Sequence, residues 1–189
     1  DKAVKALMSR FAVDAAQVVR VRRTALSLFD KISSDAGLAD THSDLLVWAT
    51  ELHEIGLSLS HVSYQQHSAY LVEASDLAGF SRQEQFFLAA LVGFQRRDIP
   101  SSYAARLPVR LHHALSVTLM CMRLSWIFCR TREDAAIPEF YIKLENSQVH
   151  LALPADWMEN HPLTMNDLEH EVQALQSIGL QLELGACRI

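Results

Sequence analysis

The sequence predicts an α+β fold, mainly α, in which a helical body is followed by a small mixed appendage. Up to about residue 133, apolar side chains recur at the spacing of amphipathic helices. After the charged segment 131–138 the apolar residues alternate, as is typical of strands. No Gly- or Ser-rich linker interrupts the body. We therefore assign residues 1–135 to a helical domain and residues 136–189 to a β-β-α-β appendage.

Capping residues locate several helix ends within the body. Asp14 is placed to cap an early helix, and Pro108 stands in the first turn of a long apolar one. Ser81 and Glu84 have the Ser-x-x-Glu spacing of a capping box, which begins another helix. Gly56 is placed to end the helix that precedes it. These positions predict a bundle of helices joined by short loops.

The appendage is predicted from alternation and turn residues. Residues 140–144 and 149–153 alternate as strands across the turn residues 145–147, so we expect a hairpin. A helix should run from Thr164 to about Ser177, and residues 180–184 are expected to form a third strand.

Composition restricts the functional class. Half of the residues are hydrophobic, 21% are charged and Gly and Pro are few, which indicates a globular and not a disordered chain. The formal net charge of −5 disfavours a nonspecific nucleic-acid binder. Cys121, Cys129 and Cys187 are too widely spaced for a zinc knuckle, so we expect reduced thiols. A cytoplasmic location follows, with peripheral membrane association left open and no membrane span.

Residues 51–71 nearly form a metal-hydrolase motif. His53 and Glu54 are adjacent at the end of an apolar helical run, and such a pair can give one nitrogen and one oxygen to a divalent metal. A second histidine, His67, follows in the next predicted helix. Whether the pair binds a metal depends on the remaining ligands.

Three segments resemble a known family: RFAVDAAQVVRV at residues 10–21, WATELHEIGLSLSHVSYQQHSAYLVEASDLAGFSRQEQFFLAALV at 48–92, and LPADWMENHPLT at 153–164. The helical body resembles the histidine–aspartate (HD) superfamily of metal-dependent phosphohydrolases. The whole chain resembles more closely the C-terminal half of the exopolyphosphatase / guanosine pentaphosphate phosphohydrolase family. The resemblance implies a degenerate HD-like helical domain followed by a small α/β tail.

The resemblance also implies a metal-ligand set, which this chain lacks. Active HD enzymes bind metal with an early histidine, the His-Asp pair and a distant aspartate, and the metal activates a water for attack on phosphorus. The early histidine falls on Gln17, and the distant aspartate falls near Ser125-Trp126. The pair itself is degenerate, with His53 followed by Glu54. We therefore predict no metal and no catalytic residue in this chain, and a structural or phosphate-facing role for the pair.

Arginines remain as candidate ligand-binding groups, because a guanidinium binds phosphate oxygens bidentately and stays charged. Arg96 and Arg97 are the leading candidates, since this position borders the active cleft in the superfamily that the chain resembles. The cations of the early helix are the next candidates. For any single arginine, the alternative is an ordinary solvent-exposed side chain on a helix face that binds no ligand. The predicted polyanion-binding set is Arg20, Arg22, Arg23, Lys31, Arg96, Arg97 and, as a weak anion contact or a packing residue, His67.

In the family that this chain resembles, catalysis belongs to an N-terminal domain with an actin-like fold. We therefore expect a noncatalytic C-terminal domain of an exopolyphosphatase, an enzyme that releases terminal phosphate from inorganic polyphosphate. Mg²⁺ is expected in the parent enzyme, bound by the N-terminal catalytic domain of the same chain, and not in this domain. The domain is expected to bind and channel the polyanion and to support a homodimer, without nucleic acid.

Three alternatives stay open. The chain can be the C-terminal domain of a guanosine pentaphosphate phosphohydrolase, with that nucleotide as its ligand. It can be a free-standing HD-type phosphohydrolase that uses His53, Glu54 and His67 as metal ligands. It can also be a purely structural dimerisation module without a ligand.

Overall fold

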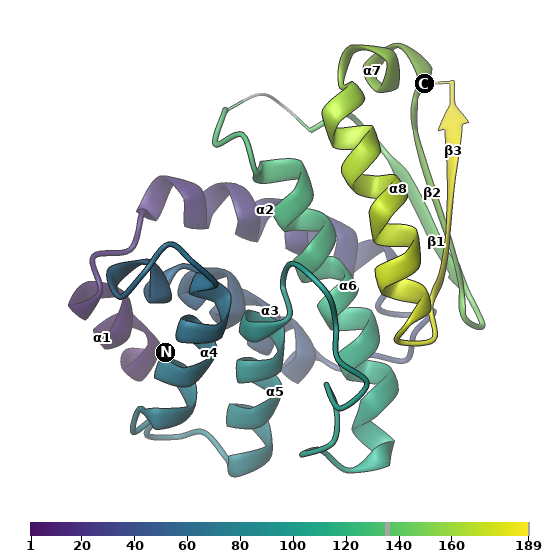
Figure 1. Ribbon diagram of the computed structural model, residues 1–189. Helices are drawn as coiled ribbons and strands as arrows, with labels where there is room; N and C mark the ends of the chain where they lie inside the picture. Colours follow the sequence, from purple (N-terminus) through teal and green to yellow (C-terminus); the bar gives the residue numbers. More distant parts are fainter. Residues whose placement is uncertain (135–136, 189) are drawn as a thin grey trace.

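The computed structural model describes residues 1–134 and 137–188, in which a helical body carries a small sheet on one side (Figure 1). The body contains α1 (Lys2–Arg10), α2 (Ala15–Ile32), α3 (Asp40–Leu52), the 3₁₀ helix η1 (Ile55–Ser58), α4 (Tyr64–Ala74), α5 (Arg82–Gly93), the 3₁₀ helix η2 (Val109–Leu111) and α6 (His112–Cys129). The appendage contains β1 (Tyr141–Glu145), β2 (Gln148–Pro154), α7 (Ala155–Asn160), α8 (Pro162–Gln176) and β3 (Gln181–Cys187). The predicted α+β class, dominated by helix, is confirmed. The predicted domain boundary falls on residues 135–136, which lie outside the described residues.

Helix α6 is the centre of the packing. It contacts α2, α3 and α5 of the body and α8 of the appendage (Figure 1). Every residue from Ala114 to Ser125 is buried, as expected for a helix with neighbours on all sides. Each fully buried side chain such as Leu115 or Leu119 contributes roughly 1.5–3 kcal/mol to folding. None of the helices in the described part of the chain combines the length and apolar character that a membrane crossing requires.

Two of the predicted caps are present and one is displaced. Asp14 Oδ1 accepts hydrogen bonds from the backbone N–H groups of the first turn of α2, at 3.0 and 3.1 Å. Ser81 and Glu84 form the predicted reciprocal capping box at the start of α5. Pro108 was expected in the first turn of α6, but it precedes η2, and α6 begins only at His112. Helices α1 and α7 were not predicted.

Gly56 has a different role from the predicted helix stop. Helix α3 already ends at Leu52, and Gly56 lies within η1. A Cβ atom at this position would lie 2.1 Å from the carbonyl oxygen of Tyr64 and 2.5 Å from the backbone nitrogen of Ser68. The Gly56 N–H donates to Ser68 Oγ at 2.8 Å. A glycine is required here because the backbones of η1 and α4 approach so closely.

The sheet has the order β1-β2-β3, with β1 antiparallel to β2 and β3 parallel to β2. The predicted hairpin turn is formed around Asn146, whose φ of 56° places it in the left-handed region that Asn tolerates. The parallel pairing requires a crossover, which α7 and α8 provide, and α8 packs on the sheet (Figure 1). The helix predicted from Thr164 begins two residues earlier, with Pro162 in its first turn.

A buried ion pair joins the appendage to the body. Arg123 of α6, which is 3% exposed, donates from Nε and Nη2 to the two carboxylate oxygens of Glu171 on α8, at 2.5 and 3.1 Å. Its Nη1 and Nη2 also donate to the carbonyl oxygens of Phe94 and Arg97, at 2.5 and 2.9 Å. Burial raises the pKa of Glu171, while the Arg123 guanidinium opposes that rise. The Arg123 side chain therefore links α6, α8 and the loop after α5 through one set of hydrogen bonds.

Removing one member of this pair should be costly. Arg123→Ala leaves the Glu171 carboxylate buried without its partner, and we expect a loss of about 3–5 kcal/mol in the free energy of unfolding, measured by urea denaturation. The matched control is Arg130→Ala, which breaks a partly exposed pair with Asp167 and should cost about 1 kcal/mol or less. Equal losses in the two variants would contradict the central role of Arg123.

The close approach at Gly56 gives a second prediction. Gly56→Ala should lower the free energy of unfolding by about 1–3 kcal/mol or more, because a methyl group meets backbone atoms that cannot rotate away. Gly185→Ala is the matched control, since no atom lies within 4 Å of a Cβ built at that position. Urea unfolding of both variants measures the difference, and an unchanged midpoint for Gly56→Ala would disprove the packing argument.

Candidate functional site

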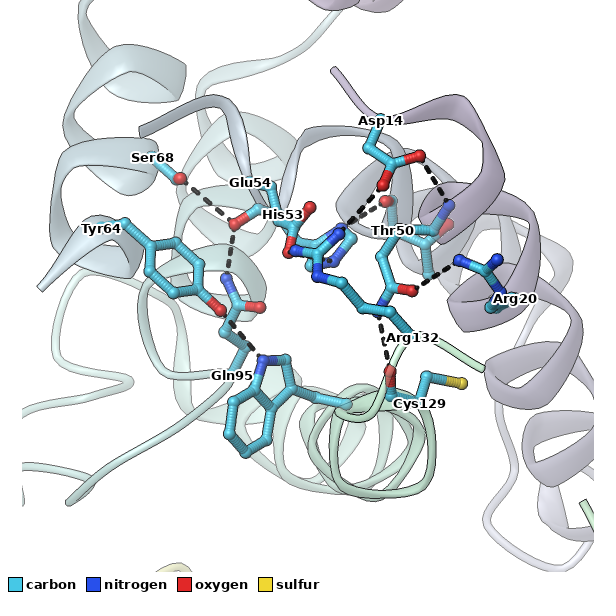
Figure 2. Close-up of polar contacts among 12 residues, drawn as sticks. Asp14, Arg20, Thr50, His53, Glu54, Tyr64, Ser68, Gln95, Cys129 and Arg132 are labelled. Carbon is cyan, nitrogen blue, oxygen red and sulfur yellow. Dashed lines mark hydrogen bonds and ion pairs between the residues drawn. The ribbon is translucent and has the colours of Figure 1, made fainter. Parts of the chain in front are cut away.

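The His53-Glu54 pair borders a cleft between the start of α2, the end of α3, α4 and the end of α6 (Figure 2). We call it the His–Glu cleft. Its volume is about 460 Å³, and its wall is formed by Gln17, Glu54, Leu57, His61, Tyr64, Arg96, Trp126, Arg130 and Arg132. The wall therefore combines three arginines with one carboxylate and two aromatic rings.

His53 is a buried, neutral residue behind this wall. It follows the last residue of α3 and is fully buried. Its Nδ1 lies 2.6 Å from the carbonyl oxygen of Thr50, which can only accept, so Nδ1 carries the proton and donates. Its Nε2 has no hydrogen-bond partner among the described residues and lies 3.8 Å from Glu54 Oε1. Burial lowers the pKa of His53, which outweighs the nearby Glu54 carboxylate, so this contact is not an ion pair near neutral pH.

Glu54 is paired with an arginine. The side chain of Arg132 donates from Nη2 to Glu54 Oε1 and from Nη1 to Asp14 Oδ2, the latter at 3.0 Å (Figure 2). Asp14 also caps α2, and these backbone hydrogen bonds lower the pKa of its carboxyl. One guanidinium thus bridges two carboxylates that come from the start of α2 and the end of α3.

The other positions of the implied ligand set are also engaged within the protein. Gln17 Nε2 donates to the carbonyl oxygen of Cys129 at 2.9 Å, and its Oε1 accepts from Arg20 at 3.2 Å (Figure 2). Trp126 lines the cleft and donates from Nε1 to the hydroxyl of Tyr64 at 2.9 Å. The hydroxyl of Ser125 is fully buried and donates to a backbone carbonyl one turn earlier.

These residues do not fit the metal that an active HD site would hold. A catalytic zinc usually has three protein ligands, and here the donors are one imidazole nitrogen and one carboxylate already bound to Arg132. Within residues 1–134 and 137–188, His, Cys, Asp and Glu form no group of three that could hold a metal ion. The positive charge beside Glu54 is supplied by the Arg132 guanidinium.

Comparison with known proteins identifies the family. The family model described as Ppx/GppA phosphatase, domain III, matches residues 1–172. The chain belongs to the Ppx/GppA phosphatase family. It is also similar to a guanosine-5'-triphosphate,3'-diphosphate pyrophosphatase of Pseudoalteromonas translucida (strain TAC 125), with 28% identity over 182 residues that cover 96% of this chain and 36% of the relative. The chain thus spans about a third of the length of that relative.

The arginines predicted to bind phosphate are distributed over several surfaces of this Ppx/GppA domain. Arg96 lines the His–Glu cleft, and Arg97 lies outside it on the exposed loop after α5. On α2, Arg20 is paired with Asp134 at 2.7 Å and Arg22 with Glu51 at 3.2 Å. The structure therefore brings only Arg96 of the predicted arginines to the cleft.

The remaining predicted residues lie away from the His–Glu cleft. Arg23 and Lys31 line a separate hollow on α2, where the Lys31 ammonium lies 5.0 Å from the ring centre of Phe140. His67 is half-buried on α4 and is not part of the cleft wall. Its predicted anion contact stays a prediction.

Sequence reasoning missed His61, Tyr64, Arg130 and Arg132 as cleft residues. Arg130 and Arg132 follow the end of α6, and Arg132 reaches a carboxylate 78 positions earlier in the chain. An arginine pair directly after a long buried helix was the one sequence feature that could have indicated them. Tyr64 and His61 gave no comparable indication, because their role depends on how α4 packs against α6.

The buried His53 predicts a pH dependence of stability. Because burial lowers its pKa below the ordinary 6.5, the unfolded chain binds a proton here that the folded chain does not bind. The resulting loss of folding stability is absent well above pH 6.5 and grows as the pH falls below 6.5. We expect His53→Gln to reduce the fall in unfolding free energy between about pH 7.5 and about pH 5.5, by up to roughly 1.4 kcal/mol, measured by urea denaturation.

The matched control for this experiment is His113→Gln, which alters an exposed histidine and should keep the wild-type pH dependence. If the free energy of unfolding falls equally in wild type and in His53→Gln over this pH range, burial does not disfavour protonation of His53 in the folded chain.

Proposed function

We propose that this Ppx/GppA domain III is a noncatalytic domain that binds the phosphate chain of its parent enzyme's substrate. The parent is proposed to be an exopolyphosphatase, which releases terminal phosphate from inorganic polyphosphate. The observation that carries the proposal is that Arg132 pairs with Glu54 where an HD enzyme would need a metal-binding carboxylate. The cleft has the charge to bind an anion and lacks the ligands for hydrolysis.

The cleft chemistry suits phosphate oxygens. Arginine binds them bidentately and keeps its charge at any relevant pH, so Arg96, Arg130 and Arg132 give the wall a fixed set of donors. Arg130 and Arg132 are partly neutralised by Asp167, Glu54 and Asp14. Arg96 has no carboxylate partner among the described residues and is the principal anchor in this proposal.

The remaining features of the parent enzyme are proposed from the family that the chain belongs to. The proposed catalytic residues and the Mg²⁺ site belong to the N-terminal domain, and the proposed partner of this chain is a second copy in a homodimer. A cytoplasmic location is part of the same proposal.

The guanosine pentaphosphate phosphohydrolase is the second candidate. The specific support is the similarity to the guanosine-5'-triphosphate,3'-diphosphate pyrophosphatase of Pseudoalteromonas translucida, which is 28% identical over 182 residues. Both ligands carry several linked phosphate groups, so the same cationic cleft suits either. The two candidates differ in the nucleoside, which polyphosphate lacks.

Isothermal titration with long-chain polyphosphate tests the proposal. The wild-type chain should bind at low ionic strength and progressively more weakly as salt is added. Arg96→Ala should weaken binding roughly tenfold, as expected for the loss of one charge-assisted contact. Arg110→Ala is the matched control, because Arg110 is an exposed arginine that lines neither the cleft nor its surroundings. Tighter binding of guanosine pentaphosphate than of polyphosphate would favour the second candidate.

Two outcomes would contradict the proposal. The first is the absence of any polyphosphate binding by a folded chain. The second is a stoichiometric divalent metal in the purified chain together with turnover of small phosphomonoesters, which would identify a free-standing phosphohydrolase.

A further inference from the structure

A second hollow adjoins the His–Glu cleft. This hollow, the α6–α8 groove, has a volume of about 350 Å³ and lies between α6, the loop after α5 and α8. Its wall shares Arg96, Trp126 and Arg130 with the cleft, whereas Arg97 and His170 line only the groove. Arg96 therefore stands at the border of two hollows.

Arg96 lies close to two aromatic rings of the cleft wall. The guanidinium carbon lies 5.0 Å from the ring centre of Tyr64 and 5.1 Å from that of Trp126. Stacking on aromatic rings uses the face of a guanidinium and leaves its N–H groups free to bind an anion in the plane. Arg96 Nε is buried and has no hydrogen-bond partner among the described residues, so an anion would contact the terminal amino groups of this side chain.

Arg97 is positioned through its backbone. Its φ of 65° lies in the left-handed region, which costs a non-glycine residue roughly 1–2 kcal/mol. Arg123 Nη2 donates to the Arg97 carbonyl oxygen at 2.9 Å, and Arg123 is itself anchored by Glu171. The buried ion pair thus maintains a strained conformation that keeps the exposed Arg97 on the groove wall.

Most of the negative charge of the groove is already paired. The Asp167 carboxylate lies 2.8 Å from Arg130, and Glu171 binds Arg123. Asp98 is the remaining acid of the wall, and it is exposed. Arg96 and Arg97 have no ion-pair partner within the described residues, so two guanidinium groups face one solvated carboxylate.

We propose that the α6–α8 groove is a second phosphate subsite, and that Arg96 lets the chain bind two phosphate groups of one oligophosphate, one in each hollow. This inference rests on the proposed function and specifies its ligand as a chain of at least two linked phosphates. Linking the two groups makes the second contact intramolecular, which raises the affinity above that for a single phosphate.

Isothermal titration of the chain with orthophosphate and with tripolyphosphate tests the two-subsite arrangement. Wild type should bind tripolyphosphate at least about tenfold more tightly than orthophosphate. Arg97→Ala should weaken tripolyphosphate binding roughly tenfold and orthophosphate binding less than about twofold, because the cleft still holds one phosphate. Arg96→Ala should weaken both, and the control Arg110→Ala should weaken neither.

Arg97→Gly separates binding from folding. It removes the same charge and also relieves the positive φ, so it should be at least as stable as wild type and lose the same tripolyphosphate affinity. Arg97 variants that bind tripolyphosphate as tightly as wild type, or that lose equal affinity for both ligands, would overturn the inference. If long-chain polyphosphate still binds and is weakened by Arg96→Ala, the proposed function survives that result. If no phosphate chain binds at all, the proposed function itself fails.

Discussion

The buried pair between Arg123 and Glu171 is the contact on which the rest of the arrangement depends. Taking two charges out of water is costly, and the cost is recovered only when geometry and additional hydrogen bonds are good. Here the carboxylate binds two guanidinium nitrogens, and two backbone carbonyls accept from the same side chain. Because these partners come from α8 and from the loop after α5, the position of the appendage and the conformation at Arg97 are set together.

In the cleft, an arginine supplies the positive charge beside the carboxylate that an active HD site would use to bind a metal. In a metal enzyme, a carboxylate at the position of Glu54 is oriented by an ion, whereas here it is oriented by Arg132. A guanidinium offers no open coordination position at which a water could be activated. The arginines of the cleft are donors with fixed charge, which fits the binding role proposed for it.

Local patterns in the sequence predicted most of the elements, since amphipathic spacing and caps such as Ser81-Glu84 depend on neighbouring residues. Gly56 was misinterpreted because its role is set by the approach of η1 to α4, which no local pattern records. The location of the cleft came from the family resemblance around His53-Glu54. Arg96 was assigned to the cleft from the same resemblance. Arg132 could not be assigned in this way, because its contact with Glu54 spans 78 positions and depends on where α6 ends.

The pairing of Arg132 with Glu54 has a consequence for the ligand proposed here. Linked phosphates are strong chelators of hard divalent cations, which prefer oxygen ligands. If the cleft used such an ion to bind the phosphate chain, the chain could chelate the ion and remove it from the protein. A guanidinium is covalently part of the chain and cannot be extracted by a chelating polymer, so the cleft keeps its positive charge whatever the concentration of free divalent cation around it.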